Sequence, residues 1–157
     1  MKKVFEKNFT SETKNLSAIS NFLKKRLQKI RLNKETIDEI LIAADEAATN
    51  IILHSYKKRK DGYIRLRLEL QDDKIILSLF DNGDTFDPDK ITPPEFSKSI
   101  GDRKIGGLGI FLMKKFMDEV TFYLKNTNLK DENEVRMIKY LKNKKRKYLL
   151  RINKEVK

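Results

Sequence analysis

The segment KIGGLGIFLMKKFMDEV, residues 104–120, holds three of the chain's 6 glycines within four positions and continues directly into an amphipathic helix. A tight turn needs one or two glycines, so a third indicates that another group comes close to the backbone. Glycines directly before a helix leave N–H groups unpaired at the positive end of the helix dipole, which suits a phosphate group. Taken alone, these glycines fit a turn, a flexible hinge or a phosphate cradle.

Two common phosphate-binding motifs do not match this segment. After Gly107 and Gly109 the dinucleotide fingerprint needs a third glycine at position 112, where the sequence has Leu112. A P-loop would continue into Gly-Lys-Ser or Gly-Lys-Thr, and neither follows. The segment therefore has to be interpreted together with the rest of the chain.

The apolar pattern of the chain predicts one α+β domain. Apolar residues at helical spacing predict helices in segments 16–30, 34–56 and 108–120. Short apolar or alternating runs predict strands in segments 4–9, 63–70, 74–81, 119–125 and 134–141. This order predicts a two-layer α/β sandwich, with the helices on one face of a mixed, mainly antiparallel sheet. Residues 82–107 contain all 3 prolines and form a loop of a length that is usually functional or mobile.

The composition excludes several classes of protein. The chain has no cysteine and its one histidine is His54, so disulfides and Cys/His zinc sites are excluded. We expect His54 to be a hydrogen-bonded structural residue. The N-terminus lacks the apolar core of a signal peptide, and no apolar run approaches the roughly 20 residues of a membrane span. We therefore expect a soluble, cytoplasmic protein.

The net charge of +12 is concentrated at the C-terminus. From Lys142 onward there are eight basic residues and one acidic residue, which carry +7 of this charge and leave +5 for the rest of the chain. This basic tail is the only argument for a nucleic-acid partner. A solvated basic tail explains the excess charge more simply. We therefore divide the chain into a domain at 1–142 and a basic tail at 143–157, and do not expect direct nucleic-acid binding.

Two further polar clusters stand out against the apolar pattern. Glu46 and Asn50 are four residues apart and share one helix face, where a carboxylate could take a proton and an amide oxygen could bind Mg²⁺. From this pair alone, an ordinary solvated helix face is the favoured interpretation. Asp81 ends an apolar strand and could accept a hydrogen bond from a ligand amine, with Gly83 leaving room for a flat ring. The alternative there is an ordinary Asn-Gly hairpin turn.

Three motifs in this order resemble a known family. The segments DEAATNIILHSY (45–56), DNGDTFDP (81–88) and GGLGIFLMKKFMDEV (106–120) resemble the N box and the two glycine boxes of the ATP-binding domain shared by gyrase, Hsp90, histidine kinases and MutL. This is the GHKL, or Bergerat, fold, and the resemblance extends over about residues 4–142. The compact length makes the chain most similar to bacterial anti-sigma factor serine kinases of partner-switching systems, the RsbW and SpoIIAB type.

The resemblance implies roles for individual residues. Glu46 is the general base, Asn50 ligates the Mg²⁺ that bridges the ATP phosphates, Asp81 accepts from the adenine amino group, and Gly83 permits approach of the ring. Residues 86–105 form the ATP lid. The other ATP-binding residues that it implies are Arg103, Lys104, Gly106, Gly107, Leu108 and Gly109.

The resemblance also implies a function and partners. The chain would be an ATP- and Mg²⁺-dependent serine/threonine kinase that binds a sigma factor, phosphorylates a STAS-type anti-anti-sigma protein and forms a homodimer. The alternative is a nucleotide-dependent binding module without phosphotransfer. A histidine-kinase module is less favoured, because His54 lies on the ATP-site helix. One departure concerns the adenine pocket, where KDENEV (130–135) replaces the small Gly/Thr turn of the family and leaves the pocket floor unassigned.

Overall fold

The computed structural model describes residues 2–90, 107–127 and 130–141, and the predicted tail at 143–157 lies outside them. The helices are α1 (Leu16–Leu27), α2 (Lys34–Asn50) and α3 (Gly107–Phe116). The strands are β1 (Lys3–Thr10), β2 (Tyr63–Leu70), β3 (Lys74–Asp81), β4 (Glu119–Tyr123) and β5 (Asn133–Tyr140). Short helical turns are η1 (Thr13–Asn15), η2 (Ile51–Ser55) and η3 (Pro88–Lys90). The predicted order of helices and strands is confirmed.

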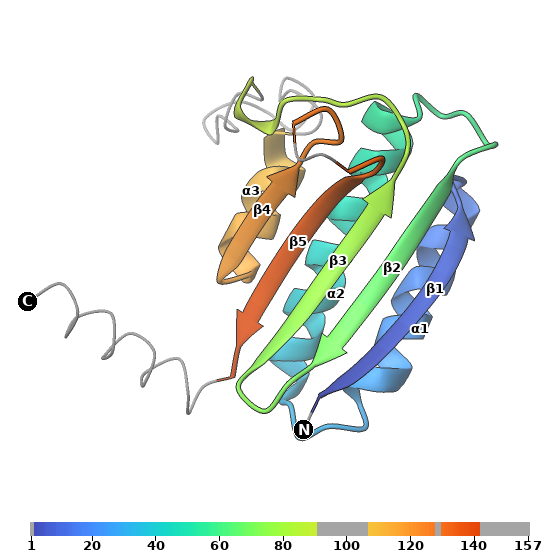
Figure 1. The fold of residues 1–157 in the computed structure, drawn as a ribbon. Coiled ribbons are helices and arrows are strands. Elements are labelled where there is room, and N and C mark those ends of the chain that lie inside the picture. The colour runs from blue at the N-terminus through green and yellow to red at the C-terminus, as the bar shows by residue number, and fades with distance from the viewer. Residues whose placement is uncertain (1, 91–106, 128–129, 142–157) are drawn as a thin grey trace, which may run out of the picture.

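The five strands form a single sheet in the order β1-β2-β3-β5-β4 (Figure 1). All four pairings between described strands are antiparallel. The predicted mainly antiparallel character is confirmed, and the expectation that the sheet is mixed is wrong for these strands. The register between β3 and β5 places Asp81 opposite Asn133. Two polar residues that lie 52 positions apart in the sequence thus meet at one end of the sheet.

The three helices cover one face of this sheet (Figure 1). Strand β2 explains why, since Ile64, Leu66 and Leu68 are fully buried while Arg65 and Arg67 between them are only half-buried. Alternating side chains of a strand point to opposite faces, so the apolar set faces the helices. The two-layer sandwich follows from this pattern, as predicted from the sequence.

Helix α2 is the central helix of the helical layer. It begins after Asn33, whose side-chain oxygen accepts a hydrogen bond from the Thr36 amide at 2.9 Å. Four alanines, all almost fully buried, let its neighbours approach closely: Ala43, Ala44, Ala47 and Ala48. Helix α2 therefore packs closely against α1, α3 and β3.

The second predicted helix changes its hydrogen bonding near its end. After Asn50 the chain continues as one π-helical turn, η2, in which the Tyr56 amide donates to the Ile51 carbonyl at 3.0 Å. Such turns shift the following side chains relative to an α-helix and are frequent at functional sites. Here the turn brings Ser55 beside the end of β3, because the Asp84 amide donates to the Ser55 carbonyl at 2.7 Å.

The helices end earlier than the apolar periodicity indicates. Helix α1 ends at Leu27, three residues before the predicted end, and α3 ends at Phe116. At the end of α3 the Asp118 amide already donates to the Ile138 carbonyl of β5 at 2.8 Å, so the sheet takes over from the helix. None of the helices within the described ranges has the length and apolar character needed to cross a membrane.

Candidate functional site

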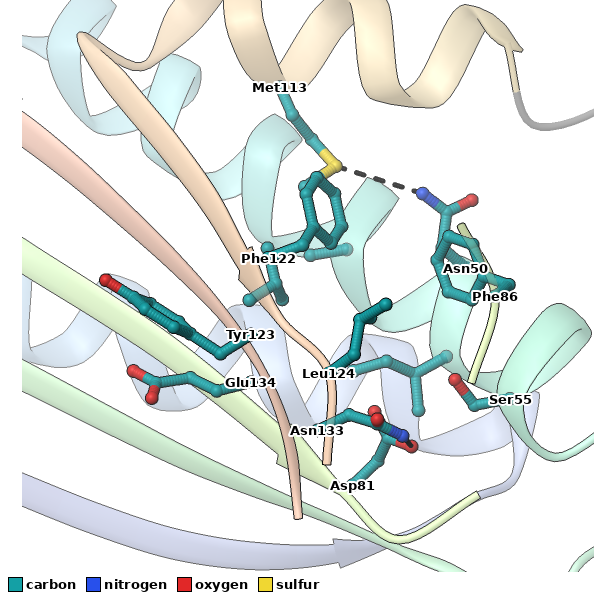
Figure 2. A pocket seen from close by; sticks show the side chains of 13 residues that line it. Asn50, Ser55, Asp81, Phe86, Met113, Phe122, Tyr123, Leu124, Asn133 and Glu134 are labelled. Carbon is teal, nitrogen blue, oxygen red and sulfur yellow. Dashed lines mark hydrogen bonds between the residues drawn. The ribbon is translucent and has the colours of Figure 1, made fainter. Parts of the chain in front are cut away.

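A pocket lies between α2, α3 and the ends of β3, β4 and β5 (Figure 2). The space at this pocket is about 370 Å³ when the open solvent at its mouth is included. Asp81 and Asn133 lie together at one end, and Asn50 and Met113 lie at the other. The lining residues are Ala47, Asn50, Ile51, Ser55, Asp81, Phe86, Met113, Phe122, Tyr123, Leu124, Asn133, Glu134 and Val135. The pocket is largely apolar, with a few polar groups at its two ends.

Asp81 is a buried carboxylate at the end of β3, with a side chain exposed by only 3%. Its Oδ1 accepts hydrogen bonds from the Gly83 amide at 2.9 Å and from Asn133 Nδ2 at 3.0 Å. Burial raises the pKa of the Asp81 carboxyl above its ordinary value, while hydrogen bonds from Asn133, Gly83 and Ser55 act in the opposite direction. A hydrogen-bond acceptor in an apolar pocket is suited to orienting a ligand that carries an N–H group.

Gly83 is held against the backbone of η2. A Cβ atom at this position would lie 2.5 Å from the Ser55 carbonyl oxygen and 2.6 Å from its carbonyl carbon. The chain therefore requires glycine here so that the turn after β3 can pack on η2. This reason is independent of a ligand, and the approach of a flat ring to Gly83 stays a prediction.

The glycine segment and the polar face of α2 come together. A Cβ atom at Gly109 would lie 2.6 Å from Glu46 Oε2 and 3.7 Å from Asn50 Oδ1. Asn50 is only 4% exposed, and its Nδ2 donates to Met113 Sδ at 3.8 Å. The interpretation of this pair as an ordinary solvated helix face is therefore wrong for Asn50.

Glu46 lies one helical turn before Asn50 and is half-buried. Burial raises the pKa of the Glu46 carboxyl above its ordinary value, and the neighbouring Asp45 carboxylate raises it further. A carboxylate with a raised pKa binds a proton more readily, which is the property required of a general base.

Some of the predicted phosphate-binding residues lie within the ranges that the structure describes, and others lie outside them. Gly107 is the first residue of α3, so its N–H belongs to the first turn, where amides have no acceptor within the helix. Leu108 follows it and is half-buried. Arg103, Lys104 and Gly106 lie outside the described residues, as does most of the predicted lid.

The predicted metal ligand is a single amide oxygen. In the described ranges no group of three or more His, Asp or Glu side chains lies close enough to hold a metal ion. A magnesium ion at Asn50 would therefore take most of its oxygen ligands from another molecule, as the phosphates of a nucleotide would provide.

Asn133 and Lys125 belong to the site but were not predicted from the sequence. Asn133 lies in KDENEV and completes the pocket floor, because it donates to Asp81 and to the Gly83 carbonyl, the latter at 3.2 Å. The ammonium group of Lys125 donates to the same Gly83 carbonyl at 2.8 Å. The signal that could have revealed Asn133 is its position directly before an apolar strand that pairs with β3.

The aromatic rings of Phe86 and Phe122 form part of the pocket wall. The Phe86 ring centre lies 5.5 Å from that of His54 and 6.2 Å from that of Phe122. His54 Nε2 is buried and has no hydrogen-bond partner among the described residues. The expectation of a hydrogen-bonded His54 is therefore wrong for this nitrogen.

Residues 9–139 match the histidine kinase-like ATPase domain, and the chain belongs to this family. Among curated proteins it is similar to the serine-protein kinase RsbW of Staphylococcus aureus. It is 39% identical over 94 residues to RsbW of strain bovine RF122 / ET3-1 and to RsbW of strain MSSA476. Each alignment covers 57% of this chain and 59% of the relative, less than two thirds of its length.

Proposed function

We propose that this chain binds Mg·ATP in the pocket and transfers the γ-phosphoryl group to a serine or threonine hydroxyl of another protein. The observation that carries this proposal is the convergence of Gly109 with Glu46 and Asn50, at the opposite end of the pocket from Asp81. One end offers an acceptor for a base, and the other offers helix N–H groups and a carboxylate. The relatives are serine-protein kinases by name, which supports the same reaction.

At the base end, the Asp81 carboxylate accepts a hydrogen bond from the exocyclic amino group of adenine. Apolar side chains on the adjoining walls, such as Ile51 and Val135, pack against the flat faces of the ring. Burial strengthens this hydrogen bond, because little water competes for the carboxylate. The base is thereby oriented so that the phosphates point toward α3.

At the phosphate end, Glu46 takes the proton of the attacking hydroxyl group. The hydroxyl oxygen forms a bond to the γ-phosphorus, the bond to the oxygen bridging the β- and γ-phosphates breaks, and ADP leaves. Asn50 would hold Mg²⁺ through its side-chain oxygen, and the bound ion would neutralise charge on the phosphates. The first-turn amides of α3, beginning at Gly107, donate to phosphate oxygens. Arg103, Lys104 and Gly106 are proposed to contribute from the lid segment.

The proposed partners follow from the resemblance to anti-sigma factor kinases. The phosphate acceptor is a STAS-type anti-anti-sigma protein, and the unphosphorylated acceptor competes with a sigma factor for this chain. We propose that the protein acts in the cytoplasm as a homodimer. We do not propose a membrane or a nucleic acid as a partner.

Phosphotransfer to a cognate STAS protein in the presence of Mg·ATP tests the proposal. The wild-type chain should produce phosphoserine or phosphothreonine, and Glu46→Gln should slow transfer about a hundredfold or more while ADP still binds. Asp45→Asn makes the same change, from carboxylate to amide, at the exposed neighbour of Glu46. Assayed at a pH well above the acid limb, where Glu46 is deprotonated in both proteins, it is the matched control and should transfer phosphate at close to the wild-type rate. Absence of transfer by a chain that binds ATP would contradict the kinase and favour a nucleotide-dependent binding module.

A further inference from the structure

Asn133 uses all of its side-chain hydrogen-bonding groups at the end of β3. Its Nδ2 donates to Asp81 Oδ1 at 3.0 Å and to the Gly83 carbonyl at 3.2 Å. Its Oδ1 accepts from the Lys125 amide at 3.1 Å. The side chain is 7% exposed, so these contacts are protected from water.

The Lys125 amide fixes which way the Asn133 amide group points. A backbone N–H can only donate, so the oxygen of Asn133 must face Lys125. The NH₂ group must then face Asp81 and Gly83. The orientation of Asn133 is therefore determined by a backbone group that no side-chain substitution removes.

The donors around Asp81 make it an acceptor. Asn133 and the Gly83 amide both donate to the Oδ1 atom of this carboxylate. An ionised carboxylate offers about four acceptor sites, and both of these donors bind Oδ1, so Oδ2 can accept from a ligand. That remaining site lies in the pocket, because Asp81 lines it.

We propose that Asn133 is a positioning residue that keeps Asp81 a hydrogen-bond acceptor and so makes the pocket select a 6-amino purine over a 6-oxo purine. This inference rests on the proposed nucleotide-binding function and names the source of its base specificity. Asn133 acts through Asp81 and need not touch the base.

The chemistry of the two bases explains the selection. Adenine presents an amino group, which donates to the carboxylate, whereas hypoxanthine presents a carbonyl oxygen in the same place. Two acceptors cannot bond, so the oxo base leaves the buried Asp81 without its partner. Burial raises the pKa of the Asp81 carboxyl, and the hydrogen bond from Asn133 lowers it. Removing the Asn133 donor should therefore raise this pKa further. A protonated Asp81 can donate a hydrogen bond to an oxo group. The preference for the amino base over the oxo base should therefore fall, and it should fall most at low pH.

Asn126 provides a matched control in the same connection between β4 and β5. It is an exposed asparagine, and the hydrogen bonds to Asp81 come from other residues. Asn126→Leu makes the same change of side chain as Asn133→Leu. Lys125 does not serve as a control, because its ammonium charge lowers the pKa of the Asp81 carboxyl.

The test is calorimetric titration of the full chain with ADP and with IDP, in Mg²⁺, over a range of pH. The wild-type chain and Asn126→Leu should each prefer ADP by about ten- to a hundredfold, the effect of one hydrogen bond to a charged group. Asn133→Leu should reduce this preference to about threefold or less, mainly by weakening ADP binding. Asn133→Asp still accepts from Lys125 and places a second carboxyl beside Asp81, so its preference should fall further as the pH is lowered.

Two results would overturn the inference. If Asn133→Asp and Asn133→Leu weaken ADP and IDP binding by the same factor, the role of Asn133 is structural only and the proposed function stands. If the wild-type chain binds neither nucleotide, the proposed function fails and the inference fails with it. Asn133→Asp keeps the test decisive where Asn133→Leu does not fold, because it preserves the size of the side chain.

Discussion

Gly109 of α3 packs directly on Glu46 of α2, so that a Cβ atom at position 109 would lie 2.6 Å from Glu46 Oε2. This contact joins the glycine segment to the residue with the properties of a general base. It also explains why glycine is needed inside the first turn of α3, where an alanine would otherwise stabilise the helix.

Gly109→Ala should separate activity from stability. The atom that it meets is the end of a flexible side chain, so Glu46 can move aside and the fold should be largely preserved. The displaced carboxylate no longer reaches the attacking hydroxyl, and phosphotransfer should fall about a hundredfold or more. Initial rates of transfer together with thermal unfolding test this, and an unchanged rate in a folded protein would contradict the role of Glu46.

Gly83→Ala should behave in the opposite way. The added methyl group meets the Ser55 backbone at 2.5 Å, and backbone atoms cannot move aside as a side chain can. We expect the free energy of unfolding to fall by about 2–3 kcal/mol, as for other overpacked sites. Urea unfolding measures this change. A loss well below 1 kcal/mol would show that η2 and the turn after β3 are not tightly packed.

The pH dependence of phosphotransfer should report the protonation of Glu46. A general base must be deprotonated, and the pKa of Glu46 is raised above its ordinary value of 4.5 by burial and then by Asp45. The rate should therefore fall as the pH is lowered through this raised pKa. Asp45→Asn removes the like charge, so the acid limb of kcat/KM should move to lower pH. A limb that does not move would show that another group titrates.

Asp81→Asn should stabilise the fold at neutral pH. The pKa of Asp81 is raised in the folded state, so the native protein holds this proton more tightly than the unfolded chain. The protonated Asp81 carboxyl therefore contributes to the free energy of unfolding at low pH. This contribution is lost as the pH rises from the ordinary pKa of an aspartate through the raised pKa of the folded state. The asparagine oxygen can still accept from Gly83 and Asn133. Urea unfolding should show the gain at about pH 7 and little gain at about pH 3.5. A variant less stable at neutral pH would contradict this account.

The sheet and its covering helices could be predicted because the spacing of apolar residues along the chain reflects which side chains are buried. The alternation of Ile64, Leu66 and Leu68 with arginines identified the face of β2 that the helices cover. The π-helical turn at Ile51–Ser55 could not be predicted, because a shift in hydrogen bonding leaves the apolar pattern intact. It matters for the site, since it sets Ser55 against Gly83.

The site was predictable where local spacing carries the information. Glu46 and Asn50 share a helix face by their spacing, and Asp81 ends an apolar strand. Asn133 was missed because its role depends on the register between β3 and β5, which places it opposite Asp81. Register between strands joined through a helix and a loop is not visible in either strand alone.

The central claim is that Asp81 binds the base of an adenine nucleotide in this pocket. Titration of ADP with Mg²⁺ into the wild-type chain and into Asp81→Asn, each shown to be folded by circular dichroism, tests it most directly. The wild-type chain should bind ADP, and the variant should bind it about ten- to a hundredfold more weakly or not at all. Equal affinity of the two proteins for ADP, or no binding by the wild-type chain, would contradict the claim.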